Sequence, residues 1–191
     1  MSLGLLRCTL EEDVLLMDCT LPALYLTGTH LPKLNAQRLQ CNGPLHLSDG
    51  FLATGLVDLS GAKITGQLAC TGGKFLAKGM ALNCDTISVG ADVFLLGEFE
   101  ARGEINLIWA EIAGNLVLSS ATLTTGLIAQ GMRARAGFIW EDVNGDGIAV
   151  DLIDAQVGTL VDSPGSWQSV NYLRLSSFRY DRIESDMDVQ E

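Results

Sequence analysis

The ten residues from Val57 to Gly66, VDLSGAKITG, contain the unit that predicts the fold of this chain. The same order of residue types returns at Ile105 (INLIWAEIAG), at Leu116 (LVLSSATLTTG) and at Val150 (VDLIDAQVG). The shared pattern is h-x-h-x-x-A-x-h followed by glycine, where h is an apolar residue. A pattern that returns at a nearly fixed period indicates a repeat architecture.

The units follow one another about every eleven residues. Their opening apolar residues stand at positions 57, 68, 82, 93, 105, 116, 127, 139, 150, 160 and 173. Glycines keep a similar interval, at positions 55, 66, 79, 90, 103, 114, 126, 137, 147 and 158. Because the two series stay in phase over a hundred residues, the repeat covers most of the chain.

Each unit has the pattern of two short strands and two bends. The h-x-h step has a period of two, so both apolar side chains point to one face of a strand. The x-x pair turns the chain, and a small residue such as Ala62 or Ala110 then fits inside the corner. The closing glycine is expected to supply a backbone conformation that costs other residues more.

A unit of this kind buries its apolar face only by stacking on its neighbours. Two units make a coil of ~22–24 residues, and stacked coils give an array roughly 35–40 Å long. The predicted fold is therefore all-β, a single parallel β-solenoid, with right-handed winding from the general crossover preference. A β-sandwich also has short strands at this spacing, but it does not require glycines and small residues in constant phase.

The chain divides into three parts on this interpretation. Residues 1–22 are apolar but less regular, and are expected to be an N-terminal cap or irregular first coil. Residues 23–183 form the solenoid. Residues 184–191 form an acidic C-terminal tail.

Composition excludes several classes of partner. The chain has 12 basic and 23 acidic residues, a net charge of −11 and no basic cluster, which argues against binding to nucleic acid or to an anionic membrane surface. No apolar run approaches the ~18 residues of a transmembrane segment. The five cysteines include no CxxC pair, so we expect reduced thiols in the core and a cytoplasmic location, with membrane association left open.

Two resemblances follow from these residues. The segments Ala62–Gly66 and Ala110–Gly114 are similar to pentapeptide-repeat proteins, although here the pentad recurs only once per unit. Gly61–Cys70, Trp167 and Leu173–Ile183 resemble a group of bacterial, largely actinobacterial, uncharacterised repeat proteins. Some of those proteins are labelled membrane-associated oxidoreductases, but no cofactor motif supports that activity in this sequence. The resemblance implies a fold rather than an activity.

The sharpest local motif runs from Asp142 through Asn144 to Asp146 and Gly147. It is similar to the first half of a calcium-binding loop, D-x-[DN]-x-[DN]-G. The acidic ligand expected at the twelfth position falls on Ile153 instead. An inter-strand turn rich in Asp, Asn and Gly is therefore the favoured interpretation, with Asp142, Asn144 and Asp146 as candidate metal ligands.

Three functional hypotheses remain from the sequence. The first is a non-enzymatic structural or protein-interaction scaffold of unknown partner, with association of the rods end to end through exposed coil edges. The second is an acidic rod that mimics DNA and inhibits a DNA-binding enzyme. The third is a polysaccharide-active β-helix enzyme. No residue is assigned a catalytic or cofactor-binding role; the acids available to the third hypothesis are Glu141, Asp142, Asp151 and Asp154, and the histidines are His30 and His46.

Overall fold

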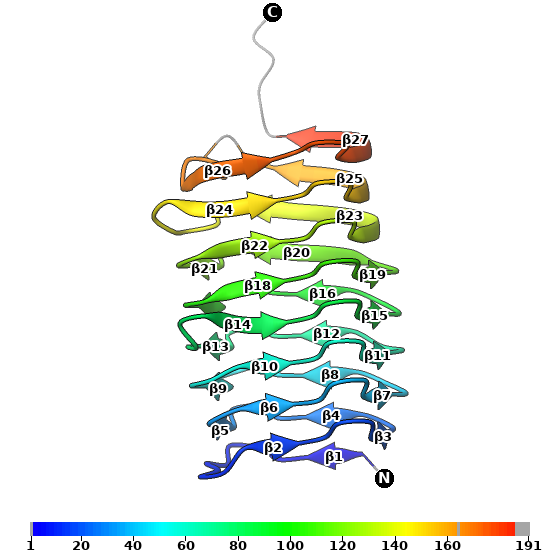
Figure 1. Ribbon diagram of the computed structural model, residues 1–191, viewed down its shortest axis with the longest axis vertical. Coiled ribbons are helices and arrows are strands. Elements are labelled where there is room, and N and C mark those ends of the chain that lie inside the picture. Colours follow the sequence, from blue (N-terminus) through cyan, green and yellow to red (C-terminus); the bar gives the residue numbers. More distant parts are fainter. Residues whose placement is uncertain (1, 164, 186–191) are drawn as a thin grey trace, which may run out of the picture.

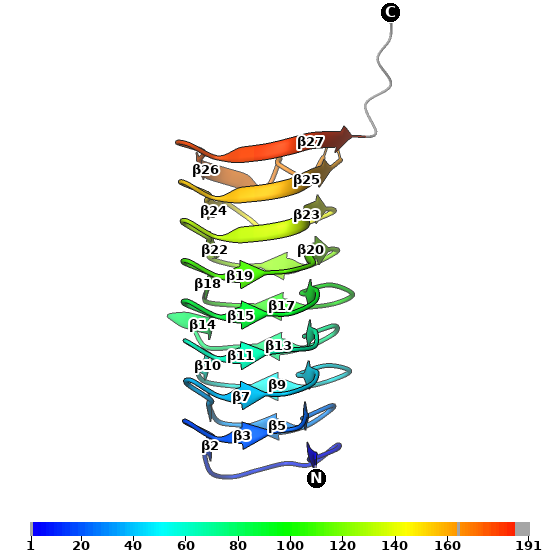
Figure 2. The same ribbon diagram turned by 90° about the vertical axis from the view of Figure 1, so that its right-hand side faces the viewer.

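The computed structural model describes residues 2–163 and 165–185, and this part of the chain contains strands and turns but no helix. Every strand pairing is parallel, and the longest separate ladder has eight strands, so the chain makes about eight turns. Viewed with the N-terminus at the bottom, the chain runs rightward across the front, around the right side and back behind (Figures 1 and 2). It rises as it does so, which makes the solenoid right-handed, as predicted.

Each coil has four sides, and we name the four ladders after the strands of one coil: β8, β9, β10 and β11. The β8 ladder contains β1 (Leu3–Gly4), β4 (Leu24–Tyr25), β8 (Leu45–His46), β12 (Leu68–Ala69), β16 (Val93–Phe94) and β20 (Asn115–Ser119). The β9 ladder contains β5 (His30–Leu31), β9 (Leu52–Ala53), β13 (Lys74–Phe75), β17 (Glu100–Ala101) and β21 (Thr122–Leu123).

The two other ladders complete the coil. The β10 ladder contains β2 (Val14–Leu15), β6 (Leu34–Asn35), β10 (Val57–Asp58), β14 (Met80–Asn83), β18 (Glu104–Asn106), β22 (Gly126–Ile128), β24 (Ile148–Asp151) and β26 (Val170–Arg174). The β11 ladder contains β3 (Thr20–Leu21), β7 (Gln40–Cys41), β11 (Lys63–Ile64), β15 (Ser88–Val89) and β19 (Glu111–Ile112). Three long strands turn the corner and continue both the β11 and the β8 ladders: β23 (Arg133–Glu141), β25 (Gln156–Asp162) and β27 (Arg179–Ser185).

The register confirms the eleven-residue half-coil. Val57 pairs with Leu82 on the β10 ladder, and Leu68 pairs with Val93 on the β8 ladder. Successive unit openers therefore lie alternately on opposite sides of the solenoid. The offset between paired residues ranges from 20 residues (Val14 with Leu34) to 26 residues (Lys74 with Glu100). The variation is absorbed in the turns, because the strands themselves stay in register.

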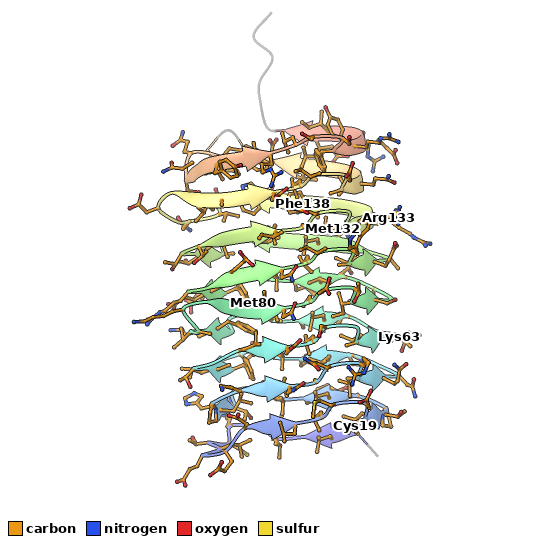
Figure 3. The ribbon with its side chains drawn as sticks, in the orientation of Figure 1. Cys19, Lys63, Met80, Met132, Arg133 and Phe138 are labelled. Carbon is orange, nitrogen blue, oxygen red and sulfur yellow. The ribbon has the colours of Figure 1, made fainter. Side chains whose placement is uncertain are left out.

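One of the predicted openers is wrong by one residue. Ile139 was expected to point inward, but Phe138 and Trp140 are the fully buried side chains, and Ile139 pairs with Val117 on the outer surface. Phe138, Ile139 and Trp140 are all apolar, so alternation gives no phase there. Figure 3 shows Phe138 within the coil, whereas Arg133, on the same strand, extends outward.

The core varies side-chain volume along the β9 ladder. Phe51, Phe75 and Phe99 stack with ring centroids 5.4 and 5.2 Å apart, and all three are fully buried. On the β9 side, each coil has two inward positions, one before and one after the outward residue. Phe51 and Phe99 occupy the first of these positions, whereas Phe75 occupies the second and Gly73 the first. One phenylalanine per coil, alternating in position, therefore fills a corner that two would overpack.

The ten glycines that separate the repeat units are required for a different reason from the one predicted. Only Gly126 and Gly147 of the ten have a positive φ angle. At Gly66, in contrast, an added Cβ would lie 2.7 Å from the backbone nitrogen of Pro44 in the coil below. At Gly158 it would overlap the carbonyl oxygen of Arg135. These glycines let adjacent coils approach closely, and backbone freedom is secondary.

Positive φ angles occur instead at the x-x pair. Gly61 has a φ of 65° in a turn closed by a 3.0 Å hydrogen bond from the Ala62 amide to the Leu59 carbonyl. Trp109 occupies the corresponding position with a φ of 52°, and Arg38 with 54°. These turns have the type II pattern, in which the third residue favours glycine or a polar residue. The exposed Trp109 is an exception that the sequence pattern did not single out.

A ladder of Asn and Asp side chains supports the turns after the β10 ladder. Asn83 Nδ2 donates to Asp58 Oδ1 at 3.1 Å, and Asn106 Nδ2 donates to Asn83 Oδ1 at 3.1 Å. Asn83 Oδ1 also accepts from the Asp85 amide at 3.2 Å, and the same local bond recurs from Ile108 to Asn106. Each side chain therefore closes its own turn and joins two coils.

Replacing Asn83 with alanine is expected to lower the free energy of unfolding by about 1–3 kcal/mol, because Asn106 Nδ2 and the Asp85 amide lose the oxygen to which they donate. Urea unfolding followed by circular dichroism measures this. Asn42 is the matched control, because it is exposed, and Asn42→Ala should change stability by less than about 0.5 kcal/mol. Equal losses from the two variants would contradict a structural role for the ladder.

The two ends of the described solenoid differ from its middle. Residues 3–21 form a first coil in register with the second, and inward residues such as Leu3 and Val14 are only partly buried. Near the other end, a turn at residues 165–169 stands where the β9 ladder would continue. Its Trp167 stacks on Trp140 with ring centroids 5.2 Å apart, and Trp140 Nε1 donates to the Ser166 carbonyl. Of the tail predicted at 184–191, residues 186–191 lie outside the described residues.

Candidate interaction surfaces

The candidate calcium ligands lie in the turn between β23 and β24. Asp142, Asn144 and Asp146 are exposed, and Asn144 Nδ2 donates to the Asp142 carbonyl at 3.0 Å. Asn144 also pairs with Thr122, so the turn continues the β9 ladder and buries Val143. Within residues 2–163 and 165–185, no group of three or more His, Cys, Asp or Glu side chains is arranged to hold a metal ion.

The acids considered for catalysis lie on different sides of the solenoid. Glu141 and Asp142 stand where the β8 side turns toward the β9 side. Asp151 belongs to the β10 ladder, on the opposite side, and Asp154 to the turn that follows it. Asp151 Oδ2 accepts from Arg174 at 2.8 Å and from Gln130 at 2.7 Å. The structure therefore brings these four acids together only as two separate pairs.

Three of the four sides present polar or charged columns to solvent. The β11 side shows Gln40, Lys63, Ser88, Glu111, Arg133 and Gln156. The β9 side shows His30, Leu52, Lys74, Glu100 and Thr122. The β10 side carries Asn35, Asp58, Asn83, Asn106, Ile128 and Asp151, of which Asp58, Asn106 and Asp151 are themselves buried. Acidic residues are scattered among these columns, and none of the columns is a continuous acidic row.

The β8 side is different, because its central column is uncharged and almost wholly apolar from β4 to β25. We call this set the apolar column: Tyr25, His46, Ala69, Phe94, Val117, Ile139 and Val161. Tyr25 and His46 contact each other with ring centroids 5.1 Å apart. Figure 1 shows the strands that carry the column stacked along the rear of the solenoid. The sequence signal was an apolar x position between the two inward residues, which the repeat pattern treats as variable.

A hollow interrupts the apolar column at Ala69. It has a volume of about 410 Å³, with His46 on one side and Phe94 on the other, and its polar rim includes Asp49, Gln67 and Thr71. Ala69 is 5% exposed and forms its floor. His46 and Phe94 are two coils apart, so at ~4.8 Å per coil the hollow has the height of one missing ring in the stack.

A second apolar surface lies at the C-terminal end of the described solenoid. The inward side chains of the last described coil remain 43–51% exposed, because no described residue covers them; they are Leu173, Leu175 and Ile183. With Trp167 and neighbouring side chains they line a hollow of about 280 Å³. Asp162 lies at the same hollow; its Oδ2 accepts from Trp167 Nε1, while its buried Oδ1 has no partner among the described residues.

The three buried thiols are held in the protonated form. Burial raises the pKa of Cys84 and, strongly, that of Cys70, and it raises the pKa of Cys41 to a smaller extent. The pKa of Asp18, in contrast, is lowered by its hydrogen bond with Arg38, whose two nitrogens each lie 2.7 Å from a carboxylate oxygen. Both charged groups are exposed at a corner of the coil.

Because the buried thiols ionise only above their usual range, a thiol reagent at pH 8 should modify Cys8 and Cys19 in the native protein and all five cysteines after denaturation. Mass spectrometry of the alkylated chain counts the modified sites. The raised pKa values favour the folded state below about pH 8.5, and this stabilisation declines as the pH rises further and the unfolded thiols ionise. Rapid native modification of Cys70 or Cys84 would contradict this packing.

No family model, no curated protein and no solved structure matches this chain. Within the described residues, no helix is long and apolar enough to span a membrane.

Proposed function

We propose that this chain is a non-enzymatic structural or protein-interaction scaffold that binds a protein partner over the apolar column. The observation that carries the proposal is the contrast between the four sides. In a chain with a net charge of −11, one side keeps its central column free of charge through seven coils. A continuous, partly exposed apolar patch of this kind is characteristic of protein interaction sites.

The rigidity of the support favours the same function. Every coil pairs with the next through parallel strands, and the inward residues form one continuous core. A surface on such a frame loses little conformational entropy on binding. End-to-end association is a further part of the proposal, supported by the partly exposed Leu173, Leu175 and Ile183 at the C-terminal end.

Capture of partners by the tagged, intact chain tests the proposal. The wild-type protein should retain a protein partner from a lysate of its source, and Phe94→Arg should release it by placing a charge in the apolar column. Trp109→Arg is the matched control, because Trp109 is 55% exposed but lies at a corner outside the column. Equal capture by both variants, or enrichment of polysaccharide alone, would contradict the proposal.

A further inference from the structure

We infer that the partner of the apolar column includes a second copy of this chain, which packs face to face as an antiparallel dimer. The inference rests on the proposed function, because it names an occupant for the same surface. In the column, the aromatic side chain of Phe94 stands directly beside the hollow at Ala69.

In this dimer the two-fold axis lies in the plane of the interface, parallel to the strands and midway between β12 and β16. About this axis the column is complementary to itself. The axis places Phe94 of each copy in the hollow at Ala69 of the other. The same operation sets His46 against Val117 and Tyr25 against Ile139, and at the edge it sets Gly4 against Val161. In every pair the larger side chain faces a smaller one, as an isologous interface requires.

The inserted ring fits the existing stack. The Tyr25 and His46 rings already lie 5.1 Å apart, close to the spacing of one coil. A phenyl ring above Ala69 would lie about one coil spacing from both His46 and Phe94. The dimer therefore completes a row of six rings, three from each copy, with tilted or offset contacts of the kind that aromatic pairs prefer.

The charged residues on either side of the column are compatible with the dimer. The side chains beside the column are mostly small and neutral, and the charged ones are Asp49, which lines the hollow, Asp92 and Glu141. The axis sets Asp92 against Gln67, and Glu141 against Thr27. The same axis sets Asp49 against Ser120, so none of the three carboxylates faces another acid, although acids outnumber bases almost two to one in the chain. Like-charge repulsion, which opposes association of acidic proteins, is therefore small at this face.

The size of the face predicts a weak dimer. Seven coils at ~4.8 Å and a strand width of four residues give a face of roughly 34 Å by 13 Å. Treated as flat, the faces of the two copies together would bury about 900 Å², which is at the small end for specific interfaces. Projecting side chains add to this area. We expect a dissociation constant on the order of 10 µM.

Sedimentation velocity of the intact chain between about 1 and 300 µM tests the dimer. The wild type should pass from monomer to dimer, and both Phe94→Ala and Ala69→Phe should raise the dissociation constant at least tenfold. The double variant Ala69→Phe/Phe94→Ala exchanges projection and hollow, so it should restore dimerisation. Trp109→Ala should dimerise like the wild type, and circular dichroism checks that every variant is folded.

A wild-type chain that stays monomeric throughout this range would overturn the inference. Dimerisation unaffected by either single variant would overturn it too, as would a folded double variant that remains monomeric. The proposed function fails separately. A monomeric chain whose capture of another protein still depends on Phe94 would refute the dimer and leave the scaffold proposal standing.

Discussion

Replacing Gly103 with alanine should lower the free energy of unfolding by about 2–4 kcal/mol, although it adds only one methyl group. The Glu104 amide donates to the Gly79 carbonyl at 2.7 Å, which draws the two coils together at this point. A Cβ on Gly103 would overlap the carbonyl oxygens of Gly79 and Ala77. Backbone atoms of two stacked coils would have to separate to admit it.

Gly79 provides the matched control within the same contact. It occupies the equivalent position one coil below, its φ is not positive, and an added Cβ would meet nothing within 4 Å. Gly79→Ala should therefore change stability by less than about 1 kcal/mol, through the entropy of the unfolded chain. Denaturant unfolding of both variants measures the difference. Similar losses at the two positions would mean that close approach is not the reason for the glycine.

Phe75→Ala should destabilise the solenoid by about 3–5 kcal/mol, the range for loss of a fully buried aromatic side chain. Phe75 is the middle ring of the Phe51–Phe75–Phe99 stack, and the other inward residue on the β9 side of its coil is Gly73. No neighbouring side chain in that corner can expand into the cavity. Exposed Tyr172→Ala is the control, with an expected change below about 0.5 kcal/mol.

Contact between the stacked rings should contribute stability beyond the burial of each ring, and a double-mutant cycle measures this contribution. In a double-mutant cycle, Phe51→Ala and Phe75→Ala should show an interaction energy of about 0.5–1.5 kcal/mol, because their rings are in tilted contact at 5.4 Å. Strictly additive losses would indicate that each phenylalanine acts only through its own buried area.

Agreement between sequence and structure is closest where residues point inward. The step Val57-x-Leu59 and the pair Ala62-x-Ile64 are all buried as the alternation predicted. The prediction is wrong at Ile139, where three apolar residues in succession remove the alternation. It is also wrong about the reason for glycines such as Gly103, because a close approach between residues two dozen positions apart has no local signal.

The candidate surfaces were beyond the reach of the repeat pattern. The residues of the apolar column, such as His46, Ala69 and Phe94, occupy x positions, and one outward residue in each coil is unremarkable by itself. They form a surface only because the parallel register repeats every 20 to 26 residues and aligns them on one side. The ligands considered for calcium, in contrast, were adjacent in sequence and form a turn of the β9 ladder.

The all-β solenoid, its eleven-residue half-coil and its inward residues could be predicted from the sequence, because alternation, small corner residues and glycine spacing are local properties of the chain. Which outward residues share a side depends on the three-dimensional structure. The lengths of the turns set the register of each coil on the next, and the register alone places Phe94 beside the hollow at Ala69.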